Sequence, residues 1–142
     1  MGKREHDHQI AALPVRLGPS GQPEILLITS RERHRWIIPK GWPMKGKADH
    51  EAAAIEAYEE AGLTGAMGER PIGSFQYRKF EDGGHGEAVR VDVYLMRVEA
   101  QRADWPERDQ RMSLWCDIDE TLIILDEPDL ARLISRIRDQ LA

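Results

Sequence analysis

The stretch DHEAAAIEAYEEAG at residues 49–62 predicts one well-defined helix, and this helix constrains the fold more than any other segment. It consists largely of residues with high helix propensity. Asp49 is suitably placed to act as its N-cap, and Gly62 can adopt the left-handed conformation that ends many helices. The sequence therefore predicts a helix with both ends defined, against which the remaining segments have to pack.

Three glutamates lie close together on this helix. At about 3.6 residues per turn, Glu56 and Glu60 fall on the same face, and Glu59 is their near neighbour. Such like-charged pairs destabilise a helix by roughly 0.2–0.5 kcal/mol each, and a bound Mg²⁺ would reverse the repulsion because it prefers oxygen ligands. Taken alone, the residues leave two interpretations open, a solvated acidic face or a metal site.

Apolar and alternating segments predict strands on both sides of the helix. Strands are expected at residues 10–18, 24–30, 36–43, 71–80, 88–100 and 112–118. Pro14 interrupts the first of them, which favours an edge position or a bulge. The turn EDGGHG at 81–86 joins two strands into a hairpin, and residues 128–142 form an amphipathic helix. This order predicts an α/β fold, with one mixed sheet and helices on both sides.

The composition limits the classes of function. The chain of 142 residues fits a single domain, 1–142, with residues 1–8 expected to be flexible. A formal net charge of −5 gives no basic bias of the kind that nucleic-acid binding needs. No apolar run approaches the roughly 20 residues that span a membrane, the N-terminus lacks a secretory signal, and Cys116 is the single cysteine. These features predict a cytoplasmic protein with no membrane or nucleic-acid partner.

The helix and the segment before it resemble a known motif. From Gly41 the chain reads GWPMKGKADHEAAAIEAYEEAGL, which is similar to the Nudix box, Gly-x5-Glu-x7-Arg-Glu-φ-x-Glu-Glu-x-Gly-φ, where φ is aliphatic. The positions in register are Gly41, Glu56, Ala57, Glu59, Glu60, Gly62 and Leu63. Residues 24–30, 36–41 and 114–120 also look like family segments, so the resemblance covers about 10–125. It implies the Nudix hydrolase superfamily (MutT-like) and its α/β/α sandwich, a mixed β-sheet between helices.

The resemblance implies roles for the helix glutamates. Carried over residue by residue, Glu56, Glu60 and the carbonyl of Gly41 would bind Mg²⁺ or Mn²⁺. Glu59 would be the catalytic base that activates water, or a ligand of a further metal ion. The reaction would be hydrolysis of a phosphoanhydride bond in a phosphorylated small molecule. A further acidic ligand from a downstream loop is common in the family, and the unranked candidates are Glu81, Asp82, Glu87 and Asp92.

Two box positions depart from the pattern. Lys47 replaces the first glutamate, and Ile55 replaces the arginine that is thought to orient glutamates of the site. Lys47 could approach an anionic substrate, and Glu51 could stand in for the missing acid. These departures keep open a second class of function, a catalytically weakened Nudix module that binds a ligand.

The segment RWIIPKGWPM looks most like the branch of diphosphoinositol polyphosphate phosphohydrolases and dinucleoside polyphosphate hydrolases. The cations expected to contact substrate phosphates are Arg31, Lys40, Arg78, Lys79 and Arg111. The inositol-specific subgroup has a basic run at its first strand, where this chain has His8-Gln9-Ile10. This difference favours a nucleoside diphosphate derivative or a dinucleoside polyphosphate. The apolar terminal segments are compatible with a homodimer, but nothing in the sequence requires one.

Overall fold

The computed structural model describes residues 7–80 and 86–142, with side chains described for 7–77 and 88–142. The strands are β1 (His8–Leu17), β2 (Pro23–Thr29), β3 (Trp36–Ile37), β4 (Lys40–Gly41), β5 (Leu63–Met67), β6 (Gly73–Phe80), β7 (Gly86–Gln101) and β8 (Ser113–Asp117). The helices are α1 (Asp49–Ala61), α2 (Ile118–Ile124) and α3 (Pro128–Ile137), with short 3₁₀ turns at Arg108–Gln110 and Arg138–Gln140.

The strands form one mixed sheet. The central order is β3-β2-β1-β7-β5, and β4, β6 and β8 pair with β1, β7 and β2 respectively. β1 and β7 run parallel, from His8 opposite Arg90 to Val15 opposite Arg97, and the other pairs are antiparallel. The predicted hairpin of β6 and β7 is present, whereas its turn at 81–85 lies outside the described residues.

Pro14 lies in an interior strand, so the predicted edge position is wrong. β1 pairs with β7 along one side, while its other side pairs first with β4 and then, from Val15 onward, with β2. Ala12 donates its N–H to the carbonyl of Pro39 on that second side. Because backbone N–H groups of alternate residues point the same way, Pro14 would direct its N–H toward the same side of β1 as Ala12. On that side Pro14 lies between the part of β1 that pairs with β4 and the part that pairs with β2, so its missing N–H costs no ladder hydrogen bond.

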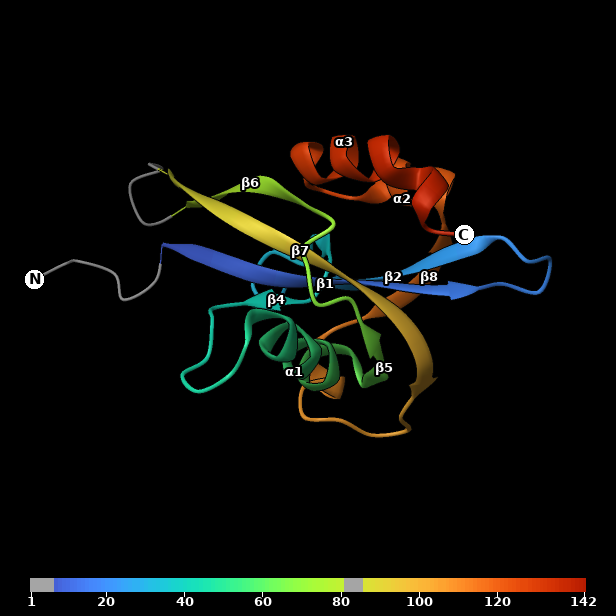
Figure 1. Cartoon of the computed structure of the whole chain (residues 1–142), viewed down its shortest axis with the longest axis horizontal. Coiled ribbons are helices and arrows are strands. Elements are labelled where there is room, and N and C mark those ends of the chain that lie inside the picture. Colours follow the sequence, from blue (N-terminus) through green and yellow to red (C-terminus); the bar gives the residue numbers. More distant parts are fainter. Residues whose placement is uncertain (1–6, 81–85) are drawn as a thin grey trace, which may run out of the picture.

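Helices cover both faces of the sheet, which confirms the predicted α/β/α arrangement (Figure 1). On one face, alternate residues of β7, namely Val91 and Val93, pack with α3. On the other face, Tyr94 and Met96 pack with α1. The inward residues of α3 are Leu130, Leu133, Ile134 and Ile137, all at most 4% exposed, as its amphipathic pattern predicts. The helix ends at Ile137 rather than at 142, and the buried Leu141 follows the 3₁₀ turn.

The ends of α1 differ partly from the prediction. Gly62 is the left-handed C-cap, with φ of 71°, as expected. The N-cap position is occupied by Ala48 rather than Asp49, and the carboxylate of Glu51 accepts the Ala48 N–H at 2.8 Å. Asp49 instead accepts a hydrogen bond at 2.8 Å from the ring of His8. Glu51 thus caps the helix, and the first turn of α1 is bound to β1.

Three other features differ from the sequence prediction or add to it. β5 and α2 were not predicted, because five-residue and seven-residue elements carry too few residues to show a period. Of the expected flexible start, residues 1–6 lie outside the described part of the chain, but His8 already pairs with Arg90 in the sheet. Among the described residues, no helix is both long and apolar enough to cross a membrane.

Gly62→Ala should destabilise the fold more than Gly21→Ala. Both glycines have φ near +80°, at 71° and 80°, but an added Cβ at Gly62 would collide with the ring of Trp105 while Gly21 has open space. We expect a loss of about 1 kcal/mol at Gly21 and about 2–4 kcal/mol at Gly62, measured by urea unfolding. Equal losses of unfolding free energy for the two variants would show that the Trp105 ring moves aside without an energetic penalty.

Candidate active site

The α1 glutamates lie where the helix meets the short strand β4. Glu60 is 5% exposed, and one of its oxygens lies 3.4 Å from the backbone nitrogen of Lys40, which donates to it. Glu56 and Glu60 hydrogen-bond through their carboxyl groups. An added Cβ at Gly41 would collide with the carboxylate of Glu56. The structure therefore brings together Glu56, Glu60 and Gly41, three of the four predicted metal-binding residues.

Burial raises the pKa of both carboxyl groups. For Glu60, desolvation is the main cause, followed by the hydrogen bond with Glu56. For Glu56, desolvation again comes first, and the neighbouring charges of Glu59 and Glu107 add to it. Two adjacent carboxyl groups in a poorly solvated position resist ionising together, and the positive charge of Arg111 opposes this effect at both of them.

This pair fits a hard dication. Carboxyl oxygens beside the backbone of Gly41 are the kind of donor that Mg²⁺ and Mn²⁺ prefer, and Mg²⁺ commonly keeps several water ligands. The three helix glutamates do not bring three ligand oxygens within 4.8 Å of one another; within the described ranges, His8, Asp49 and Asp92 do so instead. Both ring nitrogens of His8 are engaged in hydrogen bonds, to Asp7 and Asp49, so that cluster is a structural link between β1 and α1.

A fourth carboxylate comes from the loop between β7 and β8. Glu107 donates its backbone N–H to the carbonyl of Glu59 at 3.0 Å. Its carboxylate accepts the Nε of Arg111 at 2.9 Å, and Arg111 lies 3.8 Å from Glu60. Sequence reasoning missed Glu107, since the segment 103–109 has no periodicity and only its acidic residues could have pointed to it.

The other acidic candidates have different positions. Asp92 accepts a hydrogen bond from Arg90 and lies with His8, at the far end of α1 from Glu60. Glu81 and Asp82 lie outside the described residues, as does the side chain of Glu87. The described candidate that reaches the α1 glutamates is therefore Glu107.

A cleft of about 840 Å³ opens beside Glu60. The residues that line it include Arg31, Arg33, Arg35, Lys40, Glu60, Gln76, Tyr77, Arg111, Asp126, Glu127, Asp129 and Arg132. Three predicted substrate-binding residues, Arg31, Lys40 and Arg111, are thus in one cavity with a predicted metal ligand. Lys40 donates to Gln9 at 3.0 Å, and its Nζ lies 3.7 Å from the centre of the Tyr77 ring.

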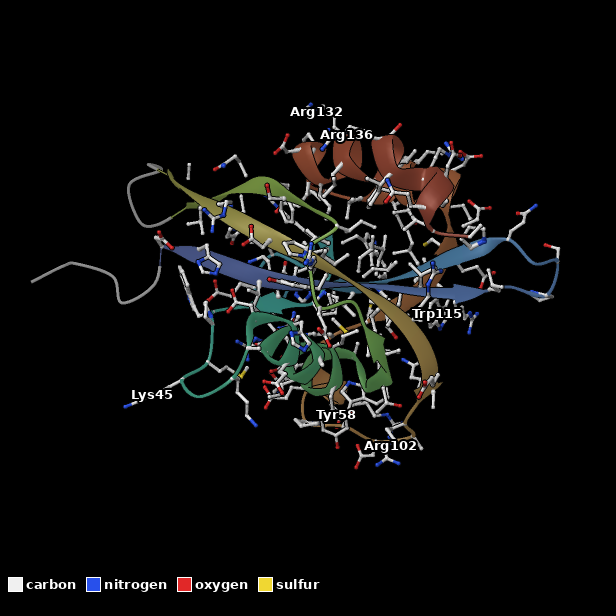
Figure 2. The ribbon with its side chains drawn as sticks, in the orientation of Figure 1. Lys45, Tyr58, Arg102, Trp115, Arg132 and Arg136 are labelled. Atoms are coloured by element: carbon white, nitrogen blue, oxygen red, sulfur yellow. The ribbon has the colours of Figure 1, made fainter. Side chains whose placement is uncertain are left out.

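Several predicted cations are elsewhere or not described. The side chains of Arg78 and Lys79 are outside the described set. Lys47 is exposed in the turn before α1, and Figure 2 shows the neighbouring Lys45 extending outward from the same loop. Ile55 is half-buried on α1, one residue before Glu56.

Glu127 is a titratable group in the cleft that the sequence did not single out. It precedes α3, and burial raises its pKa to about 7, with the charge of Lys40 acting in the opposite direction. Its carboxyl group faces the same space as Lys40 and Tyr77. The cleft therefore combines Arg31, Lys40 and Arg111 with a carboxyl group from the start of α3.

Comparison with known proteins agrees with this geometry. The chain matches the NUDIX domain family over residues 7–137, which is most of its length. The chain belongs to the NUDIX domain family. The box segment from Gly41 to Leu63 accordingly comprises the last residue of β4, the loop that follows it, helix α1 and the first residue of β5.

Individual relatives support the same membership. The chain is 32% identical over 102 residues to Nudix hydrolase 12, mitochondrial, of Arabidopsis thaliana, covering 70% of this chain and 50% of the relative. It is 32% identical over 105 residues to human diphosphoinositol polyphosphate phosphohydrolase 3-alpha, covering 72% and 60%. It spans about half the length of the curated relatives it matches.

Solved structures show the same fold. The structure of a C. elegans Ap4A hydrolase binary complex superimposes with a TM-score of 0.67 at 21% identity, covering 96% of this chain and 98% of that one. At this level of identity the likeness establishes the Nudix fold and leaves substrate preference to be argued from the cleft.

Glu127→Gln should stabilise the protein at high pH. The folded pKa of about 7 lies above the ordinary 4.5, so the wild type gradually loses stability as pH rises from about 4.5 through 7. The neutral glutamine lacks this loss. After allowing for the exposed part of the side chain, we expect a gain on the order of 1 kcal/mol near pH 8 and almost none near pH 5.

Urea unfolding at the two pH values measures this difference. Asp119→Asn is a matched control, because Asp119 is an exposed acid remote from the cleft. A gain of the same size at both pH values would show that the charge of Glu127 is not the cause.

Proposed function

We propose that this chain is a divalent-metal-dependent hydrolase that cleaves a phosphoanhydride bond in a nucleoside diphosphate derivative or a dinucleoside polyphosphate. The observation that carries the proposal is the Glu56–Glu60 pair, whose buried member Glu60 lines one cleft with Arg31 and Lys40. A carboxyl pair whose pKa values are raised by burial is suited to a dication, and cations beside it are suited to phosphate oxygens.

The metal-binding residues are proposed to be Glu56, Glu60 and the carbonyl of Gly41, with Mg²⁺ or Mn²⁺ as the ion. When bound, such an ion neutralises phosphate charge and acidifies a bound water. Glu107 lies close enough to influence both carboxyl groups and is the described candidate for an additional ligand.

Glu59 is the proposed catalytic base. It lies one residue before Glu60, and its backbone carbonyl is bound by Glu107, which fixes this turn of α1 against the loop. Its carboxylate accepts a proton from the attacking water, whose oxygen bonds to phosphorus as the bridging P–O bond breaks. The leaving phosphate takes the electron pair of that bond, and Arg31 and Lys40 stabilise the charge on the phosphate oxygens.

The charges of the cleft favour a nucleotide-type substrate. Arg35 forms an ion pair with Asp126 at 3.2 Å, and Arg132 pairs with Asp129 at 3.3 Å. With Glu32 and Glu127 also lining the cleft, its outer part is mixed in sign and unsuited to a ring of phosphates. A nucleotide carries its phosphates at one end and a neutral base at the other, and the base can hydrogen-bond to a carboxyl group such as Glu127.

Two alternatives rest on specific observations. The human relative named above as a diphosphoinositol polyphosphate phosphohydrolase supports an inositol pyrophosphate substrate. Ile55 and Lys47 support a weakened module that binds its ligand without turnover. Both predict a different pattern of products from the same substrate panel.

Purified protein with Mg²⁺ or Mn²⁺ should release phosphate-containing products from a nucleotide substrate. The panel comprises dinucleoside polyphosphates, nucleotide sugars, ADP-ribose and an inositol pyrophosphate, with products separated by ion-exchange chromatography. Glu59→Gln should lower kcat by at least about a hundredfold and leave the fold intact, because it removes the base and retains the shape.

Glu69→Gln is the matched control, since Glu69 is exposed in the loop between β5 and β6. Cleavage of the inositol pyrophosphate alone would reassign the substrate class. Ligand binding without any turnover would support the binding module. Full activity of Glu59→Gln would refute its role as base.

Metal binding should raise the melting temperature of the wild type and not that of Glu60→Gln. At about 100 times the dissociation constant, a bound ion adds about 2.7 kcal/mol to the stability of the folded state. Without metal, Glu60→Gln should be at least as stable as the wild type, because it removes a carboxyl group whose pKa is raised by burial. Thermal denaturation in EDTA and in excess Mn²⁺ measures both effects, and an equal metal-induced shift in the variant would contradict the assignment.

A further inference from the structure

Four carboxyl groups lie near one another around Glu60, which lines the cleft, and they need a counter-charge even without a metal ion. Glu56, Glu59 and Glu60 come from α1, and Glu107 comes from the loop before β8. The charges of Glu59 and Glu107 act on Glu56, and those of Glu56 and Glu107 act on Glu60. Such a cluster is destabilised by repulsion and desolvation unless a cation is placed within it.

Arg111 is placed within this cluster. Its side chain is 9% exposed, and its Nε donates to Glu107 at 2.9 Å. Its Nη1 donates to the carbonyl of Thr29, at the end of β2, at 3.1 Å, and its Nη2 lies 3.8 Å from Glu60. One guanidinium group thereby connects the β7–β8 loop, the sheet and α1.

The contacts of Arg111 differ from those expected of an arginine that binds a substrate phosphate, because they are made to groups of the protein itself. The Arg111 guanidinium group is largely buried, two of its five N–H groups donate to Glu107 and Thr29, and a third nitrogen pairs with Glu60, whereas Arg31 lines the same cleft with an exposed side chain. The field of Arg111 also opposes the effect of burial on both Glu56 and Glu60. These contacts are those of a residue that fixes the positions of Glu60 and Glu107.

The helix itself lacks a cation in this region. Position 55, one residue before Glu56 and one turn before Glu59, is a half-buried isoleucine. No arginine or lysine occurs anywhere between Asp49 and Ala61. The positive charge that accompanies the α1 glutamates therefore has to come from another element, and Arg111 supplies it from the loop.

We propose that Arg111 is a positioning residue, which holds Glu60 and Glu107 in the arrangement required for hydrolysis and replaces a cation that α1 lacks at position 55. This inference deepens the proposed function and rests on it. It predicts that the charge can be supplied from either element, so that an arginine at position 55 compensates for the loss of Arg111.

The test is a double-mutant cycle of Arg111→Gln and Ile55→Arg. Arg111→Gln should lower kcat between about tenfold and a hundredfold while KM changes less than about twofold, because the carboxylates are misplaced and the phosphate contacts remain. Adding Ile55→Arg should recover a large part of the lost kcat, whereas the same change in the wild type should have little effect. Arg111→Lys, which keeps the charge without the planar fork, should be intermediate.

A second measurement does not depend on turnover. In EDTA, Arg111→Gln should lower the melting temperature, because it leaves the carboxylate cluster without its cation. Ile55→Arg should raise the melting temperature more in the Arg111→Gln background than in the wild type, which is the coupling that a shared role requires. Arg108→Gln is the matched control, because Arg108 is a more exposed arginine of the same loop.

The outcomes separate this inference from the proposed function. A wild type without turnover on the whole panel would reject the proposed hydrolase activity, and the melting-temperature cycle would still decide whether Arg111 and position 55 serve one cluster. An increase in KM with unchanged kcat would make Arg111 a substrate contact and overturn the inference. Equal effects of Ile55→Arg in both backgrounds would overturn it as well.

Discussion

The close approach of α1 to the sheet is the constraint on which the site depends. The apolar buried face of the helix consists of Ala52, Ala53, Ala57 and Ala61, all fully buried. Because alanine side chains are small, they allow the helix to pack close to the strands. The same packing brings Glu56 against the backbone of Gly41, where a larger residue would collide with its carboxylate. A helix that packed through leucines would lie farther from β4, and its glutamates would face solvent.

This packing places carboxyl groups in a poorly solvated position and also brings them near groups that stabilise their charge. Carboxyl groups that are drawn out of water resist ionisation, and their mutual repulsion adds to the cost. The charge on Glu60 is stabilised by the guanidinium group of Arg111 and by the backbone N–H of Lys40. The carboxyl oxygens are also donors suited to a dication. The stability of the metal-free protein and its proposed capacity for an ion are therefore two aspects of the same burial.

The sequence predicted the features that local chemistry controls. The extent of α1, its stop at Gly62 and the common face of Glu56 and Glu60 follow from propensity and helical period, and the structure confirms them. The interior position of β1 was not predictable, because it depends on a change of partner opposite Pro14 that no local pattern records. Glu107, Arg111 and Glu127 gain their significance from residues distant in sequence, which only the folded chain brings near them.

The parallel pairing of β1 with β7 has a consequence for the order in which the chain folds. His8 lies opposite Arg90 and Val15 opposite Arg97, so these two central strands are separated by about eighty residues of sequence. Closing so long a loop costs conformational entropy before any contact compensates for it, and such non-local pairing is formed slowly. During synthesis, β1 therefore has to wait for most of the domain before its partner β7 is available. The cleft beside α1 is consequently among the last features of the molecule to be completed.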